Sequence, residues 1–161
     1  MRTFLICSVI ALSLISCSGP VEYVELNGLT QGTTYHIVAE KTPGLDIMAL
    51  RQDIENLFTD IDNSLSIYNP SSVISAINNN LSDTTDELFR EVFRASAVIS
   101  EESGGLFDIT IGPLVKSWGF GPDAMKRFNP AMLDSLLALV GMDKVRLEGE
   151  RIIKSDPDMF I

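Results

Sequence analysis

Two short segments near the start of the chain alternate apolar and polar residues, which is the pattern of a half-buried strand. They cover residues 21–26 and 33–39. Asn27-Gly28 follows the first segment directly, and both residue types tolerate positive φ. The pattern therefore predicts a β-hairpin with Asn27-Gly28 between its strands.

Apolar residues then recur every three or four positions, which is the repeat of an amphipathic helix. They predict a helix that begins near Asp46, a suitable N-cap, and ends at Asn69-Pro70, because proline disfavours helical dihedrals in the residue before it. The apolar stripe of this helix is Ile47, Leu50, Ile54, Leu57, Ile61 and Leu65. The short apolar patch at 73–77 leads into a predicted loop at 78–80.

Two further helices are indicated by their capping residues. The Thr-Thr-Asp-Glu sequence at 84–87 matches a capping box, and the glycines at 104–105 would end the helix. Its predicted stripe is Leu88, Val92, Ala95 and Ile99. A later helix has Asn129 as N-cap, Pro130 at its first position and Gly141 just past its end. Its predicted stripe is Leu133, Leu136, Leu137 and Val140.

The remaining apolar segments predict strands. Residues 106–115 alternate, and 144–147 and 151–154 flank a Glu-Gly-Glu turn to form a second hairpin. The strand at 106–115 would carry Phe107, Ile109 and Ile111 on one face and Asp108 and Thr110 on the other. Strands and helices mix without a regular βαβ alternation, so the predicted class is α+β, with helices and antiparallel strands.

Length and charge narrow the function classes. A chain of 161 residues favours a single domain. Its 12 basic and 22 acidic residues give a net charge of −10. This balance argues against a nucleic-acid binder, which needs Lys and Arg to neutralise phosphates, and against docking on anionic lipid through a polybasic patch.

The first 16 residues have the features of an export signal. One arginine precedes an apolar run of about 12 residues, too short to span a membrane. The residues before Cys17 resemble the bacterial lipobox, in which the cysteine is diacylated and becomes the first residue of the mature protein. We therefore expect a lipoprotein signal at 1–16 and a mature domain at 17–161, anchored in the cell envelope and facing the periplasm or the cell exterior. The alternative is an ordinary secretion signal cut nearby.

Three side chains are candidates for chemistry. His36, the only histidine, lies in a predicted strand and is more simply a solvated residue than a base or ligand, because no second His or Cys completes a zinc site. Asp108 lies among apolar neighbours and needs partners, which could be backbone donors of its own fold or donors of a ligand. Tyr68 precedes a predicted turn and could stack on a ring system or plug the turn from below.

Several stretches taken together resemble one family. Residues 30–35 (TQGTTY) resemble its T-M-G-T-x-Y opening, and 62–72 (DNSLSIYNPSS) resemble its D-x-x-x-S-x-Y-x-P-x-S segment. Residues 105–115 (GLFDITIGPLV), followed by WGF at 118–120, resemble its G-x-F-D-I-T-V-G-P-L-V…W-G-F signature. The chain resembles the ApbE-type FAD:protein FMN transferases over nearly all of its mature length.

The resemblance implies a function. Members of this family use FAD and Mg²⁺, and they transfer FMN to a Thr or Ser hydroxyl of a target protein with release of AMP. The usual targets are flavinylated subunits of redox-driven ion pumps and related electron-transfer proteins. By matching position, the residues expected to bind FAD are Gln31, Tyr68, Leu106, Phe107 and Asp108. Gln31 departs from the family methionine and replaces an apolar contact by an amide.

The resemblance covers only about the first half of the family's length. Family members continue into a glycine-rich segment and then an Asp/Thr segment that completes the Mg²⁺ site, so we expect the metal ligands beyond Ile161 and none within this chain. The sequence is therefore expected to be an incomplete N-terminal portion that is inactive alone. The alternatives are a lipid-anchored module that binds flavin or a partner without catalysis, and an inactive remnant.

Overall fold

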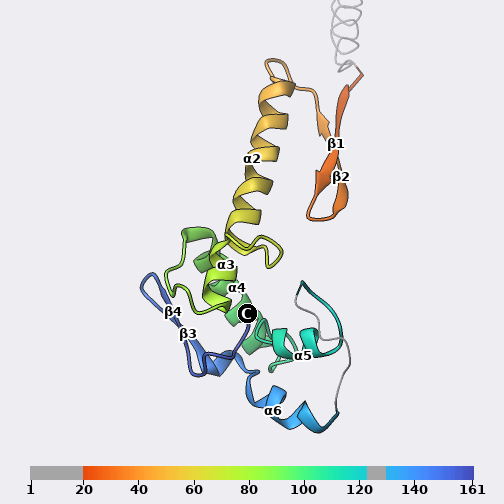
Figure 1. The fold of residues 1–161 in the computed structure, drawn as a ribbon. Coiled ribbons are helices and arrows are strands. Elements are labelled where there is room, and N and C mark those ends of the chain that lie inside the picture. The colour runs from red at the N-terminus through yellow and green to blue at the C-terminus, as the bar shows by residue number, and fades with distance from the viewer. Residues whose placement is uncertain (1–19, 123–129) are drawn as a thin grey trace, which may run out of the picture. The chain divides into compact units, whose positions relative to one another are not determined.

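The computed structural model describes residues 20–122 and 130–161 (Figure 1). The predicted leader, Cys17 and Asn129 lie outside the described residues. The chain divides into two compact units, Met1–Glu55 and Asn56–Ile161, which we call the N-terminal and C-terminal units and describe separately. Helices and two antiparallel strand pairs make up the fold, which confirms the predicted α+β class.

The first hairpin forms as predicted, but its turn lies elsewhere. Strands β1 (Tyr23–Thr30) and β2 (Thr33–Glu40) pair antiparallel, and the turn is Gln31-Gly32, with φ of 50° and 77°. Asn27-Gly28 was the wrong turn: it lies inside β1, where Gly28 pairs with Tyr35. A Cβ on Gly28 would meet the Tyr35 ring, so this glycine provides room for a cross-strand aromatic rather than a bend.

Helix α2 (Ile47–Leu65) confirms the first predicted helix and its cap, but it ends at Leu65, before the predicted end at Asn69-Pro70. One carboxylate oxygen of Asp46 accepts hydrogen bonds from the backbone N–H groups of Met48 at 2.9 Å and Ala49 at 3.1 Å. The patch at 73–77, predicted only to lead into a loop, forms helix α3 (Val73–Asn78) because Ser72 caps it by accepting from the Ser75 N–H.

Helix α4 (Glu87–Glu102) forms as predicted but buries a different face. Its N-cap is Asp86, whose carboxylate accepts from the Phe89 N–H at 2.8 Å, so Thr84 does not close a capping box. The buried positions are Phe89, Phe93, Ser96 and Ser100. The predicted stripe is displaced by one residue, and its members Val92, Ala95 and Ile99 are exposed. The two large aromatic rings, rather than the larger number of aliphatic residues, determine which face enters the core.

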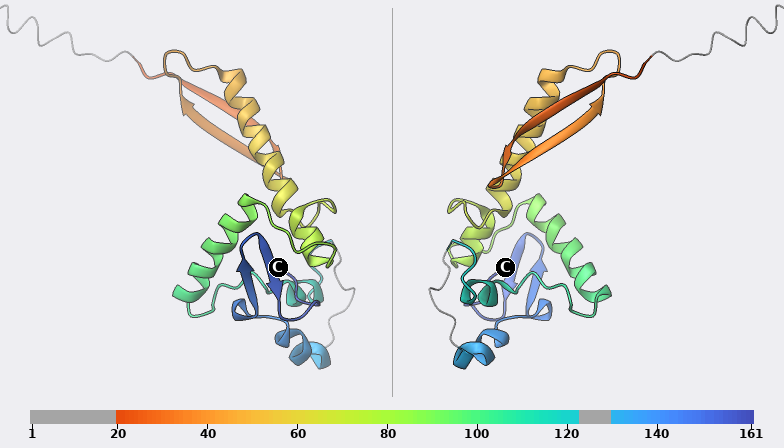
Figure 2. Two further views of the ribbon diagram at one scale, coloured as in Figure 1. Left: turned by 90° about the vertical axis from the view of Figure 1, so that its left-hand side faces the viewer. Right: turned by 90° about the vertical axis from the view of Figure 1, so that its right-hand side faces the viewer.

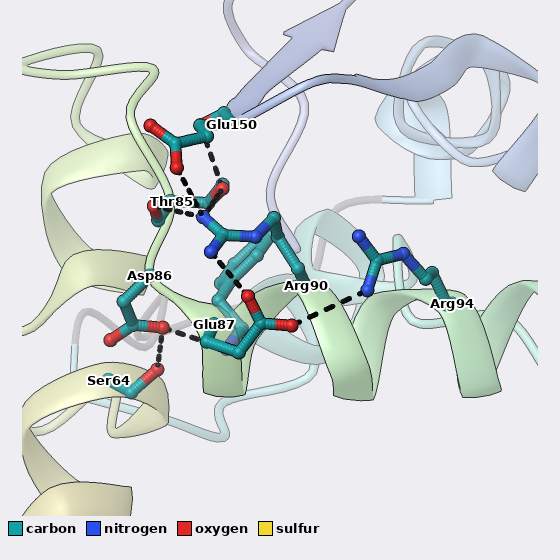
Figure 3. Close-up of polar contacts among 8 residues, drawn as sticks. Ser64, Thr85, Asp86, Glu87, Arg90, Arg94 and Glu150 are labelled. Carbon is teal, nitrogen blue, oxygen red and sulfur yellow. Dashed lines mark hydrogen bonds and ion pairs between the residues drawn. The ribbon is translucent and has the colours of Figure 1, made fainter.

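A polar network secures the start of α4 (Figure 3). Asp86 also accepts from the Ser64 hydroxyl at 2.8 Å. Arg90 donates to the Thr85 carbonyl at 2.8 Å and to Glu87 at 2.6 Å. The hydrogen bond and charge of Arg90 lower the pKa of Glu87, and the bond to Glu87 in turn raises the pKa of Arg90.

The same network reaches a hairpin far along the chain. The N–H and the hydroxyl of Thr85 both donate to the Glu150 carbonyl at 2.8 Å. Glu150 lies at the turn between strands β3 (Val145–Glu148) and β4 (Arg151–Lys154), which confirm the second predicted hairpin. Figure 2 shows this hairpin beside α4 within the C-terminal unit.

The segment 106–115 is not a strand. Residues 106–110 form turns, and Gly112–Ser117 forms helix α5 with Pro113 in its first turn. The alternation of apolar residues is overridden because Asp108 accepts the backbone N–H of Thr110, which bends the chain.

Short helices connect α5 to the second hairpin. They are the 3₁₀ turn η1 (Pro130–Met132), helix α6 (Leu133–Ala138) and the 3₁₀ turn η2 (Met142–Lys144). Of the stripe predicted for this region, Leu136 is buried, Val140 is half-buried, and Leu133 and Leu137 are exposed.

The core of the C-terminal unit joins segments far apart in sequence. It consists of Ile74, Ile77, Phe89, Phe93, Val145, Ile152, Met159 and Ile161. Half of these residues come before position 94 and half after position 144, so the last part of the chain completes the core. No helix in 20–122 or 130–161 has the length and apolar character needed to cross a bilayer.

Candidate functional site

Asp108 is held by hydrogen bonds from its own chain. Its Oδ1 accepts from the Thr110 N–H at 2.7 Å and from the Thr110 hydroxyl at 2.6 Å. Its Oδ2 accepts from the Met142 N–H at 3.1 Å. Of the two roles left open by the sequence, the structure shows the first: the carboxylate satisfies donors of its own fold. The polar contact to FAD that the resemblance implies stays a prediction.

Thr110 extends this group of hydrogen bonds, and we call the bonds made by Asp108 and Thr110 the joint. Its side chain is fully buried, and its Oγ1 accepts from the Gly141 N–H at 2.7 Å. Gly141 has φ of +147°, a conformation that favours glycine. Asp108 and Thr110 thus attach residues 105–115, which we call the signature segment, to the loop before β3. A cleft of about 430 Å³ lies beside this joint. Its lining residues include Phe93, Ser100, Gly105, Asp108, Met142 and Asp143.

Leu106 and Phe107 project from this secured segment. Leu106 is 93% exposed and Phe107 is also exposed. Their backbone is nevertheless fixed, because the Phe107 N–H donates to the Ser103 hydroxyl at 3.1 Å and the preceding glycines adopt φ of +64° and +83°. The result is an exposed apolar surface on a loop whose backbone is held in place, a feature that marks interaction sites.

Exposed aromatic rings occur on two neighbouring loops. Tyr68, just after α2, is 71% exposed and is therefore not a plug beneath its turn. A Cβ on Gly121 would lie 3.9 Å from the side chain of Ile67, so the loop after α5 approaches the turn that carries Tyr68. Trp118 and Phe120 on that loop are exposed as well. Residues 118–120 are part of the signature on which the resemblance rests, but their rings were not among the residues expected to bind FAD.

The other predicted residues have simpler environments. Gln31, in the N-terminal unit, is exposed and forms the hairpin turn with positive φ. His36 is exposed, with its Nε2 3.4 Å from a carboxylate oxygen of Glu25. In the parts of the chain that the structure describes, no three His, Cys, Asp or Glu residues gather to hold a metal ion. The described residues therefore do not fit the Mg²⁺ that the resemblance implies.

Comparisons with known proteins agree on one family. The sequence model of the ApbE family matches residues 31–161. A curated FAD:protein FMN transferase from Vibrio cholerae is 32% identical over 170 aligned residues, covering 100% of this chain and 50% of the relative. One from Haemophilus influenzae is 30% identical over 171 residues, covering 94% and 47%. The chain spans about half the length of the curated relatives it matches.

Solved structures give the same result. The flavin transferase ApbE from Vibrio cholerae superposes with a TM-score of 0.82 at 30% identity, over 88% of this chain and 48% of that one. The apo form of the Pseudomonas stutzeri flavinyl transferase ApbE gives a TM-score of 0.81 at 25% identity, over 88% and 47%.

Proposed function

The chain belongs to the ApbE family, and on this premise we propose that it forms the flavin-binding portion of an FAD:protein FMN transferase. In the proposed reaction, a Thr or Ser hydroxyl oxygen of a target protein bonds to the phosphorus of the FMN half of FAD. The pyrophosphate P–O bond breaks, AMP leaves, and the hydroxyl gives up its proton. The targets we propose are flavin-acceptor proteins of redox-driven ion pumps or related electron-transfer systems.

The observation that supports this proposal is the exposed apolar loop at residues 106–107, which is held in place by the hydrogen bonds of Asp108 and Thr110. Ligand sites combine apolar surface with a few fixed polar groups, and the joint made by Asp108 and Thr110 provides that rigidity. The exposed rings of Tyr68, Trp118 and Phe120 are suited to stacking on the rings of FAD.

The net negative charge of the chain disfavours the binding of FAD. The chain carries a net charge of −10, which opposes the anionic pyrophosphate. The resemblance implies that Mg²⁺ offsets this charge in the family, but the described residues bring together no cluster suited to it. The exposed rings of Tyr68, Trp118 and Phe120 concern binding rather than transfer, so the second candidate is a module that binds flavin without transferring it.

One assay separates the two candidates. We expect the purified chain to bind FAD, measured as quenching of flavin and tryptophan fluorescence, since Trp118 is the only tryptophan. With FAD, Mg²⁺ and an acceptor protein, we expect no covalent flavin above the no-enzyme control on a denaturing gel. A fluorescent acceptor band would show that the chain transfers FMN by itself. Absence of FAD binding would refute both candidates.

We also propose export and lipid anchoring through Cys17. Two acyl chains give stable membrane attachment, whereas one gives only marginal binding. Cys17→Ala is therefore expected to abolish processing and membrane retention in cell fractionation, and Cys7→Ala, within the same predicted leader, should leave both intact. Unchanged membrane association of the Cys17 variant would contradict lipidation.

A further inference from the structure

Asn78, at the end of α3, pairs with the backbone of a residue 83 positions away. Its Nδ2 donates to the Ile161 carbonyl at 2.8 Å, and its Oδ1 accepts from the Ile161 N–H at 2.8 Å. The side chain amide thus satisfies both polar groups of one residue, as a neighbouring strand would. Asn78 is only 8% exposed, so these buried groups would be costly to leave unpaired.

The other side of the same segment contacts the start of α5. Phe160 forms a parallel bridge with Ile111. A Cβ on Gly112 would lie only 2.9 Å from the Phe160 carbonyl oxygen, so the two backbones approach as closely as glycine permits. The Nζ of Lys116 lies 3.8 Å from the centre of the Phe160 ring. Segment 160–161 therefore lies between α3 and α5 and contacts both.

The contacts at Ile111 hold the second side of the signature segment. Its neighbour Thr110 is tied to Gly141 and Asp108 to Met142, which secures one side. The bridge to Phe160 secures the other. Loss of the second support would free residues 106–112 to shift about the first.

Other polar contacts hold the preceding residues rather than this segment. Lys154 donates to the carbonyls of Pro157 and Met159, each at 3.1 Å, and burial lowers the pKa of Lys154. Asn80 donates to the Pro157 carbonyl at 3.0 Å. These hydrogen bonds reach Pro157 and Met159, whereas Asn78 is hydrogen-bonded to Ile161 itself.

We propose that Asn78 is a positioning residue of the flavin site, which it supports by fixing segment 160–161 against the start of α5. Asn78 itself is not assigned a contact with the ligand. The proposal rests on the proposed function, because it concerns how far the loop at residues 106–108 is preorganised to bind FAD.

Asn78→Leu tests the proposal by removing both hydrogen bonds while it keeps the branching and the number of heavy atoms of the side chain. The matched control is Asn79→Leu, because Asn79 is exposed and its Nδ2 donates to the Ser75 carbonyl of the adjacent helix α3. We expect the Kd for FAD to rise at least about tenfold in the Asn78 variant, which corresponds to loss of about 1.4 kcal/mol, and to stay within about twofold in the control.

Hydrogen exchange without FAD distinguishes positioning from general stability. In the Asn78 variant, amides of residues 106–115 should exchange several-fold faster, while those of residues 89–96 in α4 keep the wild-type rate. If the Leu variant does not fold, Asn78→Asp, which keeps the Oδ1 acceptor but replaces the Nδ2 donor by a carboxylate oxygen that repels the Ile161 oxygen, is judged by the same criteria. Equal acceleration in both segments, or unchanged FAD affinity in a chain that binds FAD, would overturn the proposal. If the wild-type chain does not bind FAD, the proposed function fails, and the exchange pattern alone decides whether Asn78 positions the loop.

Discussion

Phe93→Ala is expected to lower the free energy of unfolding by about 3–5 kcal/mol. The Phe93 ring is 6% exposed and stacks on Phe89 with 6.2 Å between ring centroids. Its removal leaves a cavity between α4 and the core residues of β3 and β4. Since small domains are stable by only about 5–15 kcal/mol, this single change removes a large share of the total. Urea denaturation followed by circular dichroism measures it.

The adjacent residue provides the control. Val92 is 40% exposed, so Val92→Ala should change the free energy of unfolding by no more than about 0.5 kcal/mol. If the valine variant were the more destabilised of the two, the buried face of α4 would be the one that the aliphatic stripe predicts, and the packing described above would be wrong.

Asp108→Asn is expected to lower the free energy of unfolding by about 1.5–3 kcal/mol, because hydrogen bonds to a charged group contribute that much. Three donors converge on the two carboxylate oxygens, from the Thr110 N–H, the Thr110 hydroxyl and the Met142 N–H. An amide offers only one oxygen, so its NH₂ group must face an N–H or O–H donor whichever way it is turned. The variant should also bind FAD about tenfold more weakly, since the loop at 106–107 loses its base.

Asp143→Asn is the matched control for Asp108. Asp143 lines the same cleft and is exposed, so its replacement should leave both stability and FAD affinity close to wild type. Denaturation and fluorescence titration of the two variants separate their effects. Wild-type stability in the Asp108 variant would show that its hydrogen bonds contribute little to the fold.

The first hairpin shows what local sequence patterns can and cannot predict. Alternation correctly predicted two strands here, although the first covers 23–30 rather than 21–26 and the second covers 33–40 rather than 33–39. Asn27-Gly28 is a strong turn signal, yet the chain turns at Gln31-Gly32, because the pairing of Gly28 with Tyr35 leaves space for the ring. Turn propensity alone does not include such a cross-strand contact.

The signature segment shows a limit of a different kind. Its alternation favoured a strand, but the N–H groups of Thr110 and Met142 bond to Asp108 instead. Met142 is 34 positions away, so no local pattern contains this partner. The motifs correctly indicated the family, while the exposure of Trp118 and Phe120 near Tyr68 depends on how loops far apart in sequence approach one another.

The composition of the core has a consequence for synthesis of the protein. Ile77, Phe89 and Phe93 pack against Val145, Ile152 and Ile161, which are synthesised later. At roughly 5–20 residues per second, the roughly 70 residues from Phe93 to Ile161 take a ribosome about 3–14 s to add. During that interval the aromatic face of α4 has no partner strand to cover it. Nascent chains paused before β3 should therefore be bound by chaperones that recognise apolar segments, and release should coincide with emergence of the second hairpin and the residues that follow it.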